Sequence, residues 1–116
     1  MRAMHELSLM LSALEIAEEH ARRQGATRIH AIRLRVGRLA GVDPEALRFA
    51  FEAATAGTAA EGAALEVETV EVACRCPACE NDFTPADFVF RCPDCGRLAD
   101  DATRGRELEL VSLEVS

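Results

Sequence analysis

The stretch CPACENDFTPADFVFRCPDCG, residues 76–96, decides the fold of the C-terminal part of this 116-residue chain. It has the form C-x2-C-x12-C-x2-C, and two C-x2-C turns can present four thiolates tetrahedrally to one Zn(II) at about 2.3 Å each. Proline and glycine beside the cysteines suit the tight turns that such a site needs. The spacing predicts a structural zinc site with four ligands, which are Cys76, Cys79, Cys92 and Cys95.

An insert of about thirty residues cannot bury enough apolar surface to fold by itself, so the metal would have to supply most of its folding free energy. Three of the five phenylalanines lie between the cysteine pairs and are its expected miniature core: Phe83, Phe88 and Phe90. A thioredoxin-like redox pair needs only one C-x2-C at a helix start, and a catalytic zinc needs an open ligand position. Both alternatives fit less well than a closed structural site.

A fifth cysteine, Cys74, is left over in the run ACRCPAC. We expect it to be a small, partly buried residue, because free cysteine packs well in apolar surroundings. The alternative is that it replaces Cys76 as a ligand through a looser C-x4-C spacing.

Two helices are predicted outside the insert. Apolar residues recur at three- and four-residue intervals over about residues 6–24, which indicates one buried helical face. They are Leu7, Met10, Leu11, Leu14, Ala17 and Ala21. The second helix follows Asp43, a typical N-cap, with Pro44 at its first position.

Strand patterns occupy residues 28–37, 64–72 and 107–115, and the last two slip out of alternation at Val70 and Val111. We therefore expect an α+β fold, with two helices packed on a small, mostly three-stranded sheet and an inserted zinc-ribbon-like module. Residues 1–72 and 106–116 would form one domain and residues 73–105 the module. Arg33 and Arg35 alternate like Glu66 and Glu68, so cross-strand ion pairs are expected if the two strands are neighbours.

The composition argues against nucleic acid and membranes as binding partners. The formal net charge is −7, which opposes binding to nucleic acid. No apolar run approaches the length that spans a bilayer, and no signal-peptide pattern is visible. We expect a cytoplasmic protein without a membrane partner. No nucleophile–base set or open metal site indicates an enzyme.

The opening stretch MRAMHEL places His5 directly after Met4. In a chain that started at Met4, the α-amine, the amide of His5 and its imidazole could close adjacent chelate rings, and the amide of Glu6 could join them. Nitrogen donors in a plane suit Ni(II) or Cu(II). The residues Met1, Arg2 and Ala3 would displace that amine, so we expect either that Met4 is the native start or that the metal site is arranged differently.

The chain resembles the HypA family of hydrogenase maturation factors, which are nickel metallochaperones. The resemblance rests on MHELSL, GATRI, VGRLAGVDPEAL, FEAATAGTAAEGA, CRCPAC, RCPDCG and GRELELVSLEV, which cover nearly the whole chain. It implies a nickel site at Met4, His5 and Glu6 in the first domain and the structural zinc site already described. Asp43 matches an acidic position near the family's nickel site.

The resemblance also implies a transferable Ni(II) cargo, delivered for [NiFe]-hydrogenase and in some members for urease. The implied partners are a HypB-type GTPase and the hydrogenase large-subunit precursor, and a homodimer is a compatible assembly. The alternative from another class is a zinc-ribbon protein-interaction adaptor without a transferable metal.

Overall fold

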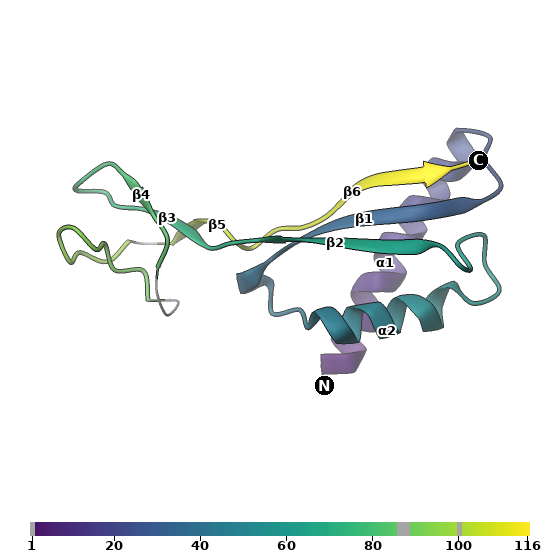
Figure 1. The fold of residues 1–116 in the computed structure, drawn as a ribbon, viewed down its shortest axis with the longest axis horizontal. Coiled ribbons are helices and arrows are strands. Elements are labelled where there is room, and N and C mark those ends of the chain that lie inside the picture. The colour runs from purple at the N-terminus through teal and green to yellow at the C-terminus, as the bar shows by residue number, and fades with distance from the viewer. Residues whose placement is uncertain (1, 86–88, 100) are drawn as a thin grey trace. The chain divides into compact units, whose positions relative to one another are not determined.

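The computed structural model describes residues 2–85, 89–99 and 101–116, with side chains from residue 5 onward. Phe88 and the side chain of Met4 therefore lie outside the described residues. The elements are α1 (Arg2–Arg23), β1 (Ile29–Gly37), a short 3-10 helix (Arg38–Ala40), α2 (Pro44–Thr55), β2 (Ala64–Val70), β3 (Ala73–Arg75), β4 (Asp82–Phe83), β5 (Ala102–Arg104) and β6 (Leu108–Val115) (Figure 1). No helix among these residues is long and apolar enough to cross a membrane.

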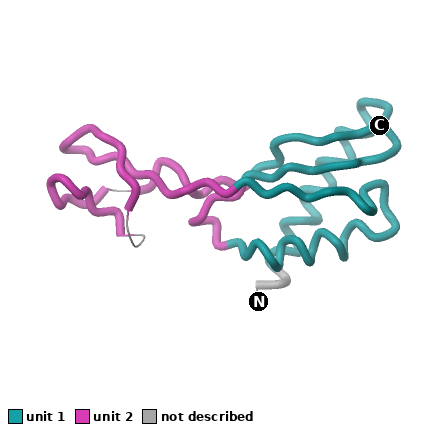
Figure 2. Tube along the Cα trace, viewed as in Figure 1, with its two compact units in different colours: residues 1–35, 42–68, 109–116 teal, residues 36–41, 69–108 magenta. Residues whose placement is uncertain are grey.

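The chain divides into two compact units (Figure 2). Unit 1 contains residues 1–35, 42–68 and 109–116, and unit 2 contains residues 36–41 and 69–108. Unit 2 thus includes three segments that the sequence pattern placed in the other domain, residues 36–41, 69–72 and 106–108. The expected α+β class is confirmed, because two helices and a three-stranded sheet lie outside the cysteine-bearing unit.

Unit 1 forms its core from the apolar faces of α1, β1 and α2. The buried side chains include Met10, Leu14, Ala17 and Ala21 of α1, Ile32 and Leu34 of β1, and Leu47 and Phe51 of α2. Leu11 is 49% exposed, although the helical pattern placed it with the buried residues. It lies at the flank of the stripe, where the side chain is turned towards solvent.

The sheet of unit 1 has the strand order β2-β1-β6. Ion pairs join Arg33 to Glu66 at 3.0 Å and Arg35 to Glu68 at 3.4 Å, as the alternation predicted. The partners advance together along the chain, so β1 and β2 run parallel, with α2 as the connection between them. At the other edge, Ser116 N–H donates to Arg28 O at 3.0 Å, and β6 runs antiparallel to β1.

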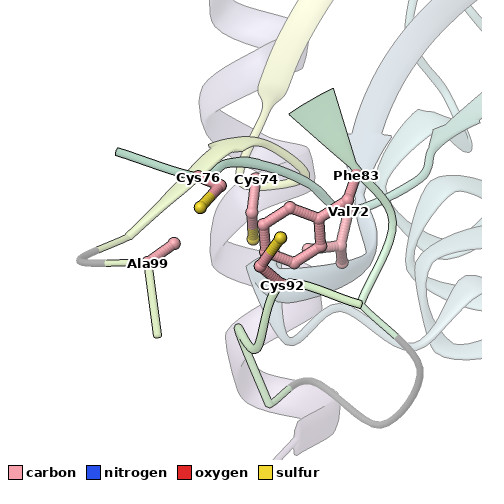
Figure 3. Close-up of a cluster of buried hydrophobic side chains, with 6 residues drawn as sticks. All are labelled: Val72, Cys74, Cys76, Phe83, Cys92 and Ala99. Atoms are coloured by element: carbon pink, nitrogen blue, oxygen red, sulfur yellow. The ribbon is translucent and has the colours of Figure 1, made fainter. Parts of the chain in front are cut away.

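Unit 2 contains a second three-stranded sheet of order β4-β3-β5, in which both pairings are antiparallel. Its buried cluster contains three of the cysteines together with Val72, Phe83 and Ala99 (Figure 3). Phe83 is buried and Phe90 packs against the cluster, as expected for the miniature core.

The slip in alternation at the end of β2 has a structural cause. Val70 and Val72 are both buried, at 5% and 4% exposure, and both fall in unit 2, whereas residues 64–68 belong to unit 1. Val72 belongs to the buried cluster of unit 2. The chain therefore changes its surroundings where the pattern changes. At Val111 the cause differs, because β6 is an edge strand and none of its eight side chains is buried.

Candidate metal centres

The four sulfur atoms predicted as zinc ligands lie together in unit 2. The Sγ atoms of Cys76, Cys79, Cys92 and Cys95 are all within 4.8 Å of one another. Sulfur atoms at about 2.3 Å from a tetrahedral Zn(II) would be about 3.8 Å apart, so the cluster has the right size. The Cys76–Cys95 separation of 3.5 Å is far longer than a disulfide bond, and all five cysteines are free. The donor set fits a four-thiolate metal site.

The two cysteine pairs are held by turns with the same backbone pattern. Cys76 N–H donates to Asn81 O at 3.0 Å, and Cys92 N–H donates to Arg97 O at 2.8 Å. In each turn the residue four positions after the first cysteine donates back to that cysteine's carbonyl oxygen: Glu80 to Cys76 at 2.8 Å and Gly96 to Cys92 at 2.9 Å. Both of these residues have positive φ, 57° for Glu80 and 76° for Gly96.

Hydrogen bonds within the cluster separate the acidities of its thiols. Cys79 N–H donates to Cys76 Sγ at 3.3 Å, and this bond lowers the pKa of the Cys76 thiol to about 7. Hydrogen bonding to Cys95, and then to Cys76, raises the pKa of the Cys79 thiol to about 12. Without a metal, the four thiols therefore do not all ionise together near neutral pH. A divalent cation favours the ionised form of all four, because it neutralises several adjacent thiolates at once.

Cys74 is fully buried in the cluster beneath these turns, close to Phe83 (Figure 3). Burial raises the pKa of its thiol. Cys74 is not among the four cysteines whose ligand atoms converge. Its position agrees with the expectation that it is a small buried residue.

The second candidate centre lies at the start of α1 in unit 1. His5 is exposed, and Glu6, the next residue, is fully buried. Glu6 Oε1 accepts a hydrogen bond from Asp43 N–H at 3.0 Å, while Glu6 Oε2 is buried without a partner among the described residues. The structure therefore brings together two of the residues that the sequence associated with nickel, Glu6 and Asp43.

Asp43 has the capping role that the sequence predicted. Its Oδ1 accepts from Glu45 N–H at 3.0 Å at the first turn of α2, and Pro44 follows it. Its own N–H is the group that binds Glu6. Sequence reasoning missed the burial of Glu6, because a glutamate in the first turns of a helix is ordinarily solvated and its partner is 37 positions away in the chain.

Comparisons with known proteins agree on one family. The model of the family described as "Hydrogenase/urease nickel incorporation, metallochaperone, hypA" matches residues 4–115. A hydrogenase maturation factor HypA from a Picosynechococcus strain is 48% identical over 112 residues, which cover 97% of this chain and 99% of the relative. A HypA from Roseiflexus is 45% identical, with 96% and 91% covered.

Two solved structures have a similar fold over nearly the whole length. The solution structure of a HypA protein superposes with a TM-score of 0.74 at 29% identity, covering 97% of both chains. The solution structure of the nickel metallochaperone HypA from Helicobacter pylori gives a TM-score of 0.67 at 27% identity, covering 95% of this chain and 96% of that one.

Proposed function

The chain belongs to the HypA family, and we propose that it is a nickel metallochaperone that binds Ni(II) and releases it for the maturation of a [NiFe]-hydrogenase. The observation that carries the proposal is the match over residues 4–115, which includes the histidine, the acidic residues and the four cysteines discussed above. Nickel is the cargo in this proposal. A protein of this kind performs no reaction of its own, and it has to bind the ion weakly enough to release it.

His5 is the proposed principal nickel ligand. Its side chain is exposed, so the imidazole is accessible to an ion. In the chain that starts at Met1, α1 begins at Arg2 and the nitrogen of Met4 is a peptide amide. In a chain that starts at Met4, that nitrogen is a free amine and can close a chelate with His5. The family match begins at this same residue.

Glu6 is proposed to contribute its backbone nitrogen, since its side chain is fully buried and one carboxylate oxygen accepts from Asp43 N–H. The hydrogen bond from Asp43 N–H to Glu6 Oε1 holds the residue next to His5 against the first turn of α2. In a chain that starts at Met4, the N–H of Glu6 lies in the first helical turn and has no partner within the helix, so a metal could take the place of its proton without breaking the helix. Met4, His5 and Glu6 would then surround one nickel ion, with Asp43 close by.

A structural zinc ion is proposed for the four-cysteine cluster of unit 2. Four thiolates close the coordination shell and leave no position for a substrate or a water molecule. When bound, the ion would supply the stability that a small unit lacks. We expect the family's partners, a HypB-type GTPase and a hydrogenase large-subunit precursor, with urease as a second target, and action in the cytoplasm.

The test is an equilibrium titration of zinc-loaded protein with Ni(II). Three proteins would be compared: the chain that starts at Met4, the chain that starts at Met1, and His5→Ala in the shorter chain. We expect one nickel ion bound by the first protein and most of the affinity lost in the other two. Equal binding by all three would exclude the terminal chelate, and absence of nickel binding by the shorter chain would favour a zinc-ribbon adaptor without a transferable metal.

A further inference from the structure

A groove of about 490 Å³ runs between the C-terminal part of α1 and the strand β6 in unit 1. Its polar lining comes from His20 of α1, from Gln24 just after that helix, and from Ser112 of β6. Its apolar lining comes from β6 and includes Leu110, Leu113 and Val115. Figure 1 shows β6 at the edge of its sheet, with α1 behind the sheet. None of the residues proposed to bind metal lines this groove.

The edge of β6 is open. Within the described part of the chain, no side chain hydrogen-bonds to the backbone of residues 108–115. On an edge strand of eight residues, about four residues direct their N–H and C=O groups away from the sheet. Such a row is a template for one more strand unless the protein covers it or gives it protective charges.

The opposite edge of the sheet, β2, differs in this respect. The Arg48 guanidinium of α2 donates to Leu65 O at 3.1 Å and so occupies a carbonyl of that strand. The exposed carboxylates of β2 are also paired, Glu66 with Arg33 and Glu68 with Arg35. A hollow of about 450 Å³ also adjoins β2, and Arg48 lies in its lining. Within the described residues, β6 is the edge whose groove adjoins a strand with no side chain bonded to its backbone.

The charge of β6 indicates which kind of peptide segment would bind along this strand. The strand carries Glu109 and Glu114 and no basic residue. Glu109 is only loosely paired, at 3.8 Å from Arg35, and within the described residues Glu114 has no ion-pair partner. We infer that β6 and the groove beside it bind an extended segment of a partner protein in which basic side chains alternate with apolar ones, added to the sheet as a fourth strand.

A second copy of this chain is a poorer occupant. Two β6 strands that paired with each other would bring together four carboxylates, two from each copy, with no basic residue in either strand to oppose them. An alternating basic strand would instead place its cations beside Glu114 on one face of the sheet and its apolar side chains against Leu113 on the other. This inference concerns a protein partner and does not depend on nickel binding.

The test uses a labelled octapeptide of alternating lysine and valine with the zinc-loaded full chain at low salt. Fluorescence anisotropy measures affinity, and amide hydrogen exchange locates the site. We expect alternate amides of β6 to become protected when the peptide binds, while those of β2 do not change. Glu114→Lys should weaken binding about tenfold or somewhat less, because it reverses one rim charge.

Two controls make the outcome decisive. Glu52→Lys, on the exposed surface of α2, makes the same charge change away from β6 and should alter the affinity less than about twofold. An alternating glutamate–valine peptide should not bind. Three results would each overturn the inference. They are protection of β2 instead of β6, equal weakening of peptide binding by both variants, and peptide binding without any backbone protection. Protection of β6 by self-association in the absence of peptide would overturn it in favour of a homodimer.

Discussion

Glu6 and Asp43 are joined by a hydrogen bond of 3.0 Å that runs from the Asp43 backbone N–H to Glu6 Oε1 and connects the start of α1 with the start of α2. The carboxylate is fully buried, and its second oxygen is unpartnered within the described part of the chain. A buried carboxylate with an unpartnered oxygen is costly. Burial of the charge therefore opposes folding, whereas the hydrogen bond from Asp43 N–H favours it.

Glu6→Gln should leave the stability of the protein unchanged or slightly higher, because the amide oxygen can still accept from Asp43 N–H and no charge is buried. Glu6→Leu should cost about 1–3 kcal/mol, since the Asp43 N–H loses its acceptor. Urea denaturation would measure both. Glu15→Leu on the exposed face of α1 is the control and should change the free energy of unfolding by less than about 0.5 kcal/mol. If the Gln variant lost as much as the Leu variant, the charge itself would be required.

The twin turns of the cysteine cluster differ in the residue that adopts positive φ, Glu80 in one and Gly96 in the other, and this difference can be exchanged. Glu80 has a φ of 57°, a conformation that costs a side-chain-bearing residue about 1–2 kcal/mol, part of which glycine avoids. Glu80→Gly should therefore stabilise the protein by up to about 1 kcal/mol, whereas Gly96→Ala, at φ 76°, should destabilise it by a similar amount. Denaturation at a fixed free zinc concentration would test both variants, and effects of the same sign would contradict the explanation.

Gly37 approaches the backbone of Gly105 so closely in unit 2 that position 37 does not tolerate a larger residue. A Cβ atom on Gly37 would lie 2.0 Å from Gly105 O, the same oxygen that accepts from Leu39 N–H at 2.7 Å. We expect Gly37→Ala to cost about 2–4 kcal/mol, because the backbone has to separate and that hydrogen bond weakens. Gly62→Asn is a suitable control: φ is +79°, the space is open, and asparagine tolerates this conformation. A Gly37→Ala protein as stable as this control would rule out the close approach.

These contacts mark where sequence reasoning succeeds and where it stops. Helix α2 was predictable because Asp43 and Pro44 act locally, and the cysteine cluster was predictable because two short turns fix the spacing of its ligands. The burial of Glu6 was not predictable, because it depends on a backbone group 37 residues away in the chain. The close backbone approach at Gly37 was not predictable either, because a glycine at the end of a strand indicates a turn as readily as a close approach of two backbones.

The fifth cysteine allows metal binding and core packing to be separated in one experiment. Cys74 and Cys92 are both buried in the same cluster, but only Cys92 belongs to the four converging thiols. Cys92→Ala should abolish stoichiometric zinc binding and expose the backbone of residues 73–105 to hydrogen exchange, as should removal of zinc from the unmodified protein by a chelator. Cys74→Ala should keep one zinc ion and lose only about 1 kcal/mol of packing. Zinc content by mass spectrometry and exchange of β3 amides would report the two effects separately. If Cys74→Ala also lost the metal, Cys74 would be a ligand and the looser C-x4-C spacing would apply.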